Sequence, residues 1–263
     1  MIMMNKKNTA LLFLGSLFLA SCGGGGGGGS GGGSSSGSSS AVTTPSKPEG
    51  AYIGNTSDGN DTWTLVLDND QLFSIYGRTV NSQFQVSGFV TGKGVASNGS
   101  YPVTETVDFN YTDVLRGSAT FTYVAGKSLA GSFSEAGRTV SFTSQATKTS
   151  VYDYAQPARL ATVGGTWTLA DLTGTWHTLT IGGDSTLRGS TPSGCVYTGT
   201  IAPRGNKNVF DVALTFGAAP CRYPGLKQTG VAVSYTLPNG MSQMMLAATD
   251  AAQANGTLLI GSR

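Results

Sequence analysis

The amino-acid sequence predicts an all-β protein of two tandem small antiparallel β-barrels, or one barrel and one sandwich, after a signal peptide and a disordered linker. From residue 50 onward, short segments rich in Val, Thr, Phe and Tyr alternate polar and apolar residues between Gly, Asn, Ser or Asp, which is typical of half-buried strands. Residues 23–40 contain only glycine and serine. The alternation is interrupted over residues 151–163. One larger two-sheet sandwich is the alternative.

The first series of strands predicts an N-terminal β module over residues 49–148. Residues 62–67 alternate polar and apolar side chains, and Asp68-Asn69-Asp70 then supplies a turn. No segment of this half has a convincing helical period. The other predicted strands here are 72–77, 83–90, 104–110, 117–124, 129–133 and 138–143.

The second series predicts a C-terminal β-barrel module over residues 149–263. The interruption at 151–163 contains Pro157, which suits the first position of a short helical turn, and a further short helix is expected within 158–172. Strands joined by short turns close most simply into an up-and-down barrel, which leaves no open edge. The predicted strands are 174–181, 185–189, 196–201, 209–216, 231–237, 243–249 and 257–261.

The first 22 residues have the pattern of an export leader. Lys6 and Lys7 precede an apolar run over 9–20, which is too short to span a bilayer but suits a signal peptide. Leu-Ala-Ser-Cys, ending at Cys22, resembles the lipobox of bacterial lipoproteins. The resemblance implies a signal peptide over 1–21 and a Cys22 that carries fatty acyl chains such as palmitate. A plain signal peptide with a chance cysteine is the alternative.

The segment that follows Cys22 predicts a tether. Residues 22–48 hold the lipidated cysteine and a Gly/Ser-rich linker, which cannot bury a core and is expected to be disordered. A chain of this length and composition spans about 25–30 Å. By resemblance to enterobacterial sorting, Gly23 favours the outer membrane, with the leaflet left open.

The charge composition of the chain limits the classes of partner that we expect it to bind. The chain has 16 Lys and Arg and 14 Asp and Glu, and because Lys6 and Lys7 belong to the leader, the remainder is close to neutral. This balance offers no electrostatic case for nucleic acid. We therefore expect attachment to the membrane through the N-terminal lipid and, beyond that, a protein or another envelope component as partner.

Two cysteines remain once Cys22 is assigned to lipid. An even pair in an exported chain, Cys195 and Cys221, predicts a disulfide. Its loop of about 26 residues corresponds to roughly 3.5 kcal/mol in the chain-entropy model. Two free buried thiols are the alternative.

Gly174-Thr175-Trp176 resembles the G-x-W that opens the first strand of lipocalin-type barrels. In that family the Trp plugs the closed end and an Arg from the last strand packs over it. The resemblance implies a structural plug of Trp176 and Arg263, with a cation–π contact of about 1 kcal/mol. The same three-residue pattern recurs at Gly165-Thr166-Trp167.

The whole layout resembles a group of uncharacterised proteobacterial outer-membrane lipoproteins that have a lipobox, a Gly/Ser tether and two β-rich modules. In the second module the resemblance rests on 152–167, 193–199, Ala219-Pro220-Cys221 and Gly261-Ser262-Arg263. That group has no established activity to carry over.

Residues for catalysis or metal binding form no pattern in the sequence. His177 is the only histidine, there is no G-x-S-x-G nucleophile elbow, and we expect His177 to be a solvent-facing strand residue. Acids such as Asp108 and Glu135 are scattered, with no spacing that forces two carboxylates together. We therefore expect no enzyme activity, no cofactor and no metal site.

Three functions follow from these observations. The first is a lipid-anchored outer-membrane or cell-surface protein that acts as a non-enzymatic binding or structural module. The alternative is a lipocalin-like carrier of a small apolar ligand in the C-terminal barrel, which requires an open apolar cavity there. The third, an envelope hydrolase, requires acids or a nucleophile converging on a cleft with His177.

Overall fold

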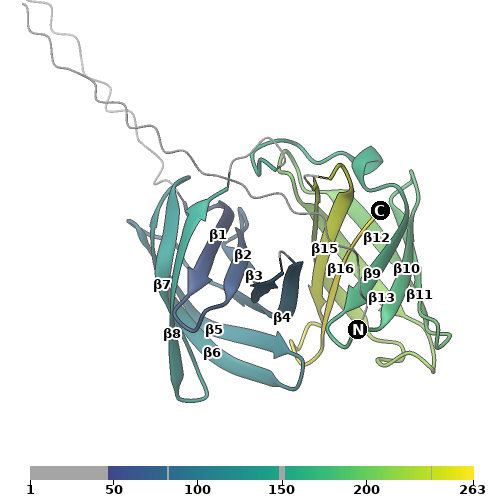
Figure 1. Ribbon diagram of the computed structural model, residues 1–263, viewed down its shortest axis with the longest axis horizontal. Coiled ribbons are helices and arrows are strands. Elements are labelled where there is room, and N and C mark those ends of the chain that lie inside the picture. Colours follow the sequence, from purple (N-terminus) through teal and green to yellow (C-terminus); the bar gives the residue numbers. More distant parts are fainter. Residues whose placement is uncertain (1–46, 82, 148–151, 238) are drawn as a thin grey trace, which may run out of the picture. The chain divides into compact units, whose positions relative to one another are not determined.

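The computed structural model describes residues 47–81, 83–147, 152–237 and 239–263. These residues form two closed antiparallel barrels of eight strands each, the first purple to teal and the second green to yellow in Figure 1. The predicted all-β class with two tandem barrels is confirmed. Among the described residues no helix is long and apolar enough to cross a membrane. Cys22, the signal peptide and nearly all of the linker lie outside the described ranges.

The N-terminal barrel follows the order of the chain, and its last strand pairs with its first. Its closed end is filled by aromatic and aliphatic side chains that include Tyr52, Tyr101 and Leu129, all of them buried. Pro48, from the end of the predicted linker, accepts a hydrogen bond of 2.7 Å from the Tyr52 hydroxyl. The strands are β1 (Gly50–Thr56), β2 (Asp61–Val66), β3 (Gln71–Val80), β4 (Gln83–Lys93), β5 (Ser100–Asn110), β6 (Val114–Val124), β7 (Ser128–Glu135) and β8 (Arg138–Ala146).

The C-terminal barrel closes through a strand that the sequence did not predict, β9. The short helix expected within 158–172 is wrong, apart from a single 3₁₀ turn, η1 (Leu160–Thr162). β9 pairs with both β10 and β16. The strands are β9 (Gly165–Asp171), β10 (Trp176–Ile181), β11 (Thr186–Ser190), β12 (Val196–Pro203), β13 (Phe210–Phe216), β14 (Lys227–Thr236), β15 (Ser242–Thr249) and β16 (Gly256–Ser262).

The plug of the C-terminal barrel is Trp167, and the assignment to Trp176 is wrong. The Arg263 guanidinium lies 4.3 Å from the centre of the Trp167 ring and donates hydrogen bonds to the carbonyls of Gly164 and Thr162. Trp167 is 1% exposed, whereas Trp176 is 47% exposed. Because strand side chains alternate, Trp176 faces outward when its neighbour His177 faces inward. The first strand of this barrel therefore opens with Gly165-Thr166-Trp167.

Side chains fill the interior of the C-terminal barrel. Inward residues such as Leu169, Leu179, Phe210 and Leu246 are almost fully buried in one cluster. Eight strands leave an interior just wide enough for side chains, and large ones occupy it here. This packing argues against the expected carrier of an apolar ligand in this barrel.

The predicted disulfide between Cys195 and Cys221 is confirmed. Their Cα atoms lie 4.4 Å apart, within the range for a disulfide. The bridge joins the β11–β12 turn to the loop after β13, next to Phe216 and Tyr223, whose rings pack edge to face. It therefore covers the end of the barrel opposite Trp167.

Both faces of β15 are buried, which explains why its sequence does not alternate. Met244 and Leu246 face the interior of the C-terminal barrel, while Met245 and Ala247 join a second cluster with Phe73 and other residues of the N-terminal barrel. Among the described residues, no strand of one barrel pairs with a strand of the other. The described residues nevertheless belong to one compact unit.

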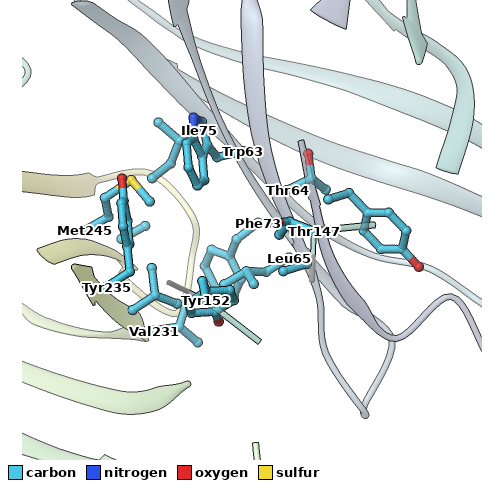
Figure 2. A pocket seen from close by; sticks show the side chains of 14 residues that line it. Trp63, Thr64, Leu65, Phe73, Ile75, Thr147, Tyr152, Val231, Tyr235 and Met245 are labelled. Carbon is cyan, nitrogen blue, oxygen red and sulfur yellow. The ribbon is translucent and has the colours of Figure 1, made fainter. Parts of the chain in front are cut away.

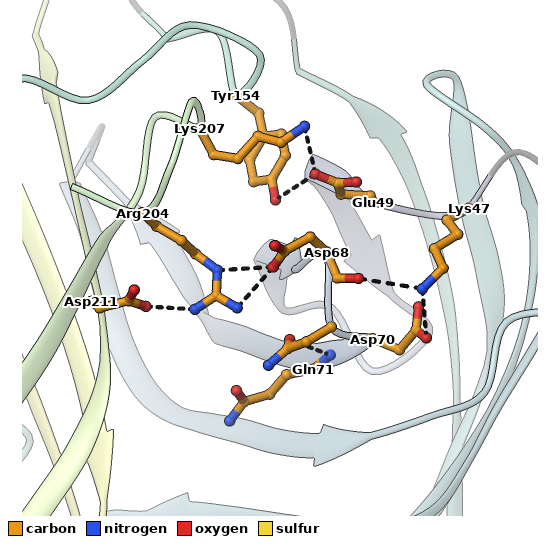
Figure 3. Close-up of polar contacts among 10 residues, drawn as sticks. Lys47, Glu49, Asp68, Asp70, Gln71, Tyr154, Arg204, Lys207 and Asp211 are labelled. Carbon is orange, nitrogen blue, oxygen red and sulfur yellow. Dashed lines mark hydrogen bonds and ion pairs between the residues drawn. The ribbon is translucent and has the colours of Figure 1, made fainter.

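Ion pairs and hydrogen bonds also join residues of the two barrels (Figure 3). Arg204 donates to Asp68 from Nε at 2.9 Å and from Nη2 at 2.8 Å, and it also pairs with Asp211. Lys207 and the Tyr154 hydroxyl both reach Glu49, at 2.7 and 3.2 Å. Partly exposed ion pairs contribute little stability individually. Most of the stabilisation of the contact between the two barrels therefore comes from the apolar cluster.

We predict that Trp167→Ala lowers the free energy of unfolding by about 3–5 kcal/mol, because it removes a fully buried plug. Trp176→Ala is the matched control and should cost less than about 1 kcal/mol, since its ring is largely exposed. Urea unfolding of the two variants measures both values. Equal losses, or a larger loss for Trp176→Ala, would contradict the assignment.

Candidate functional site

Several hollows lie among the described residues, and three of them adjoin buried aromatic or ionisable side chains. The smallest is an apolar pocket of about 40 Å³ beside the stacked rings of Trp63 and Tyr235, whose centres are 5.4 Å apart (Figure 2). Ile75, Met245 and Val231 also line it. This volume holds no more than one or two water-sized groups. We interpret it as a packing gap within the shared cluster.

A groove of about 280 Å³ contains the single histidine. His177 is buried rather than solvent-facing, so that expectation is wrong: Nδ1 lies 3.0 Å from the Tyr197 hydroxyl and Nε2 lies 3.4 Å from Asp171. Asp171 also accepts hydrogen bonds from Thr173 and Thr175. Burial alone would raise the pKa of Asp171, but the hydrogen bonds from His177, Thr173 and Thr175 together outweigh burial and hold this pKa below its usual value. Because each of these polar side chains has a hydrogen-bond partner within the protein, we interpret the cluster as structural.

The third hollow is a cavity of about 170 Å³ inside the N-terminal barrel, at the end opposite Tyr52 and Tyr101. We call it the cup. Its walls combine apolar and polar side chains from all eight strands and from the β1–β2 turn. The lining residues are Thr56, Asp58, Asn60, Thr62, Thr64, Leu72, Ser74, Tyr76, Val90, Asp108, Phe121, Phe133, Glu135, Arg138, Val140 and Phe142.

Small inward side chains open the cup. Thr64 pairs with Ser74 across β2 and β3, and their hydroxyls lie 2.7 Å apart. Thr62 pairs with Tyr76 one step nearer the mouth. Where the C-terminal barrel places Leu, Ile and Phe, this end of the N-terminal barrel places Thr and Ser, so its interior stays hollow.

A buried carboxylate forms one wall of the cup. Asp108 is 3% exposed, and the Tyr76 hydroxyl lies 2.9 Å from each of its two oxygens. The Tyr76 ring reaches Asp108 across Gly88, where a Cβ would lie 2.5 Å from the Tyr76 hydroxyl oxygen. Burial raises the pKa of Asp108, although the bond from Tyr76 opposes that shift. Burial and Asp108 together raise the pKa of Tyr76, so its hydroxyl stays protonated and donates.

A second carboxylate, Glu135, shares the cup with Asp108. Burial, and then the nearby charge of Asp108, raises the pKa of Glu135 to about 7. The Oε2 atom of Glu135 is buried and has no hydrogen-bond partner. The same is true of the Oγ1 atom of Thr62. The cup therefore presents polar atoms that the protein itself does not satisfy.

The rim of the cup carries an ion pair. Arg138 pairs with Asp58 at 2.6 Å, and the Arg138 side chain is 63% exposed. Arg138 stands opposite Glu135 in the β7–β8 pairing. The exposed arginine marks the side on which the cup meets solvent.

The predicted site residues and the cup do not coincide. Cys22 lies outside the described residues, Cys195, Cys221 and Trp176 belong to the C-terminal barrel, and Arg263 packs on Trp167. Asp108 and Glu135 are far apart in the sequence and were expected to be scattered acids, yet strand pairing brings them into one cavity. For Glu135 the available signal was its position in 129–135, where it continues the alternate positions of Leu129 and Phe133; no comparable alternation surrounds Asp108 in β5.

Within the described ranges, no group of three or more His, Cys, Asp or Glu side chains is placed to hold a metal ion. The cup thus offers two carboxylates, hydroxyls and aromatic rings, and its chemistry is that of hydrogen bonding and charge.

Comparison with known proteins gives no family. No protein-family model and no curated protein matches the chain. A "putative outer membrane protein" from Bacteroides fragilis is 11% identical, with a TM-score of 0.24 over 82% of this chain and 96% of that one. A protein of unknown function in the DUF3598 family from Nostoc punctiforme is 11% identical, with a TM-score of 0.25 over 82% and 94%. Similarity at these scores carries no argument about function.

We predict that Glu135→Gln stabilises the protein more at pH 8 than at pH 4.5. The folded state raises the pKa of Glu135 from 4.5 to about 7, so it binds a proton that the unfolded chain releases. The resulting stability is complete below pH 4.5 and is lost as pH rises through 7. Allowing for the partial exposure of Glu135, the loss is about 1 kcal/mol.

Urea unfolding at both pH values measures this effect, with Glu105→Gln as the control. Glu105 is exposed on the barrel surface beside Arg116, so its variant should show no such rise. A difference between Glu135→Gln and the native protein that is the same at both pH values would contradict the prediction.

Proposed function

We propose that this protein is a lipid-anchored outer-membrane protein that binds a small ligand, without catalysis, in the cup of its N-terminal barrel. The observation that carries the proposal is the cavity of about 170 Å³ with unsatisfied polar atoms in its wall. Ligand sites are typically concave and largely apolar, with a few convergent polar groups. The cup has this composition.

The cost of the unsatisfied atoms supports a ligand. A buried polar atom without a partner costs about 1–3 kcal/mol, and the wall of the cup contains two such atoms, Thr62 Oγ1 and Glu135 Oε2. The C-terminal barrel pairs its buried His177 with Tyr197, and its one buried atom in this state among the described residues, Gln228 Oε1, lies in a barrel whose interior is filled by side chains. In the N-terminal barrel the unsatisfied atoms of Thr62 and Glu135 belong to residues that line an open cavity, and this combination supports a ligand.

Binding is favoured over catalysis by the state of the polar groups. Among the described lining residues, the Ser74 hydroxyl bonds to Thr64 rather than to a base, and the Tyr76 hydroxyl is held protonated against Asp108. The single histidine lies in the other barrel. The two hydroxyls therefore have no adjacent base to activate them as nucleophiles, which supports binding rather than covalent catalysis through them.

The leader supports the membrane anchor. A basic start, an apolar run and Leu19-Ala20-Ser21-Cys22 precede a Gly/Ser segment, and several acyl chains, at about 0.8 kcal/mol per buried CH₂, make attachment effectively permanent. The tether would then hold the barrels away from the lipid surface.

The test is an NMR screen of small organic compounds, some cationic, some anionic and some neutral, against the unlipidated mature chain (Cys22→Ser). We expect some of these fragments to shift the backbone amide signals of Thr62, Ser74 and Val90. Ser74→Phe, which fills the cup, should abolish these shifts. Thr122→Phe, on the outer face of β6, should leave them unchanged. If no fragment moves these signals in a folded protein, the cup is not a ligand site.

The anchor has a separate test in cells. Cys22→Ser should abolish labelling by radioactive palmitate and release the protein from the membrane fraction. A variant with both Cys195 and Cys221 changed to serine should keep the label, because those residues form the disulfide. Palmitate labelling that survives Cys22→Ser would refute lipidation at this residue.

A further inference from the structure

The acids of the cup outnumber its cations. Asp58, Asp108 and Glu135 line it, and Arg138 is the one basic side chain among its described lining residues. Arg138 is committed to Asp58 at the rim, at 2.6 Å. Among the described lining residues, Asp108 therefore has no cation of its own, and Glu135 has only the nearby charge of Arg138, which is already paired with Asp58. A buried carboxylate gains most from a partner that carries positive charge and donates hydrogen bonds.

An independent observation points to the same kind of ligand. Thr62 is 2% exposed, lines the cup, and its Oγ1 has no hydrogen-bond partner. Glu135 Oε2 is likewise buried without a partner. A carboxylate oxygen only accepts hydrogen bonds and a hydroxyl oxygen readily does so. A ligand with several N–H donors in one group would satisfy both atoms.

The remaining walls define the body of the ligand. Phe121, Phe133, Phe142 and Val90 supply apolar surface around the polar wall. The cup, at about 170 Å³, is similar to cavities of about 150 Å³ that hold a single benzene ring. Aromatic faces also attract a cation electrostatically.

We propose that the cup binds a small organic ammonium ion, with its ammonium group at Asp108, Glu135 and Thr62 and its apolar body against the phenylalanines. This proposal rests on the proposed function of the cup as a ligand site and names the class of its ligand. Phenylalkyl amines combine the required charge, donors and size.

Binding of such an ion depends on the protonation state of Glu135. The pKa of Glu135 is raised to about 7 by burial and by Asp108, so at lower pH this carboxyl is protonated and has no charge to offer. The other charged groups that line the cup are Asp58, Asp108 and Arg138. An ammonium ion favours ionised Glu135, and its affinity therefore rises as pH increases through 7.

The test is calorimetric titration of the unlipidated mature chain (Cys22→Ser) with three probes of one shape: 2-phenylethylammonium, 2-phenylethanol and phenylacetate. At pH 8 we expect the ammonium ion to bind at least about tenfold more tightly than the alcohol, and phenylacetate not to bind. Between pH 8 and pH 5.5 the affinity for the ammonium ion should fall at least about tenfold. Over this range the affinity for the alcohol should stay constant.

Variants assign the effect to the carboxylates. Glu135→Gln should weaken the ammonium ion about tenfold or more and remove most of the pH dependence, while Glu105→Gln, on the outer surface, should leave both unchanged. Asp108→Asn should also weaken binding, and because it disturbs the bond to Tyr76, its folding is checked by thermal unfolding. Glu135→Gln carries the test if Asp108→Asn fails to fold.

The outcomes separate the two proposals. Equal binding of the ammonium ion and the alcohol, or an unchanged affinity in Glu135→Gln, would overturn the choice of ligand class while leaving the cup as a binding site. Absence of binding by all three probes, together with no fragment shifts in the NMR experiment, would overturn both.

Discussion

Closing a sheet of eight strands sets the constraint on which both halves of this protein depend. The interior of such a barrel is just wide enough to be filled by side chains, so the size of the inward residues decides whether it is solid or hollow. The C-terminal barrel places Trp167, Phe210 and aliphatic residues inside and is packed throughout. The N-terminal barrel is packed around Tyr52 and Tyr101 at one end and lined by Thr62, Ser74 and other short polar residues at the other.

The two barrels accommodate a buried ionisable side chain through the same local arrangement. In each, a tyrosine ring lies across a glycine of a neighbouring strand and its hydroxyl lies beside a buried ionisable group. Tyr76 crosses Gly88 to reach Asp108, and Tyr197 crosses Gly189 to reach His177. A Cβ at either glycine would collide with the ring. The difference is that His177 has its own carboxylate, Asp171, whereas Asp108 has a second carboxylate as neighbour.

The strands were largely predictable from the sequence because alternation of polar and apolar residues reports directly on a half-buried strand. β9 was missed because Leu160, Ala161 and the apolar residues up to Leu172 also fit a short helix. That error displaced the start of the barrel and led to Trp176 in place of Trp167. The disulfide between Cys195 and Cys221 could be predicted from two observations alone, the number of cysteines and the export leader.

The cup could not be predicted because its residues are far apart in the chain. Tyr76 and Asp108 meet through the registers of β3 with β4 and of β4 with β5, and Glu135 joins them through those of β5 with β6 and of β6 with β7. Alternation places each side chain inside a barrel, but register decides which ones share a level. The β-bulge at Tyr76 and Gly77 shifts one of these registers, and nothing in the spacing of the acids indicates it.

The location of a bound ligand tests the account most directly. A crystal structure of the mature chain grown with 2-phenylethylammonium should show the ammonium nitrogen within hydrogen-bonding distance of Glu135 and Thr62, and the phenyl ring against Phe121 or Phe133. Electron density for the ligand only outside the N-terminal barrel, with the cup filled by water or by rearranged side chains, would contradict it.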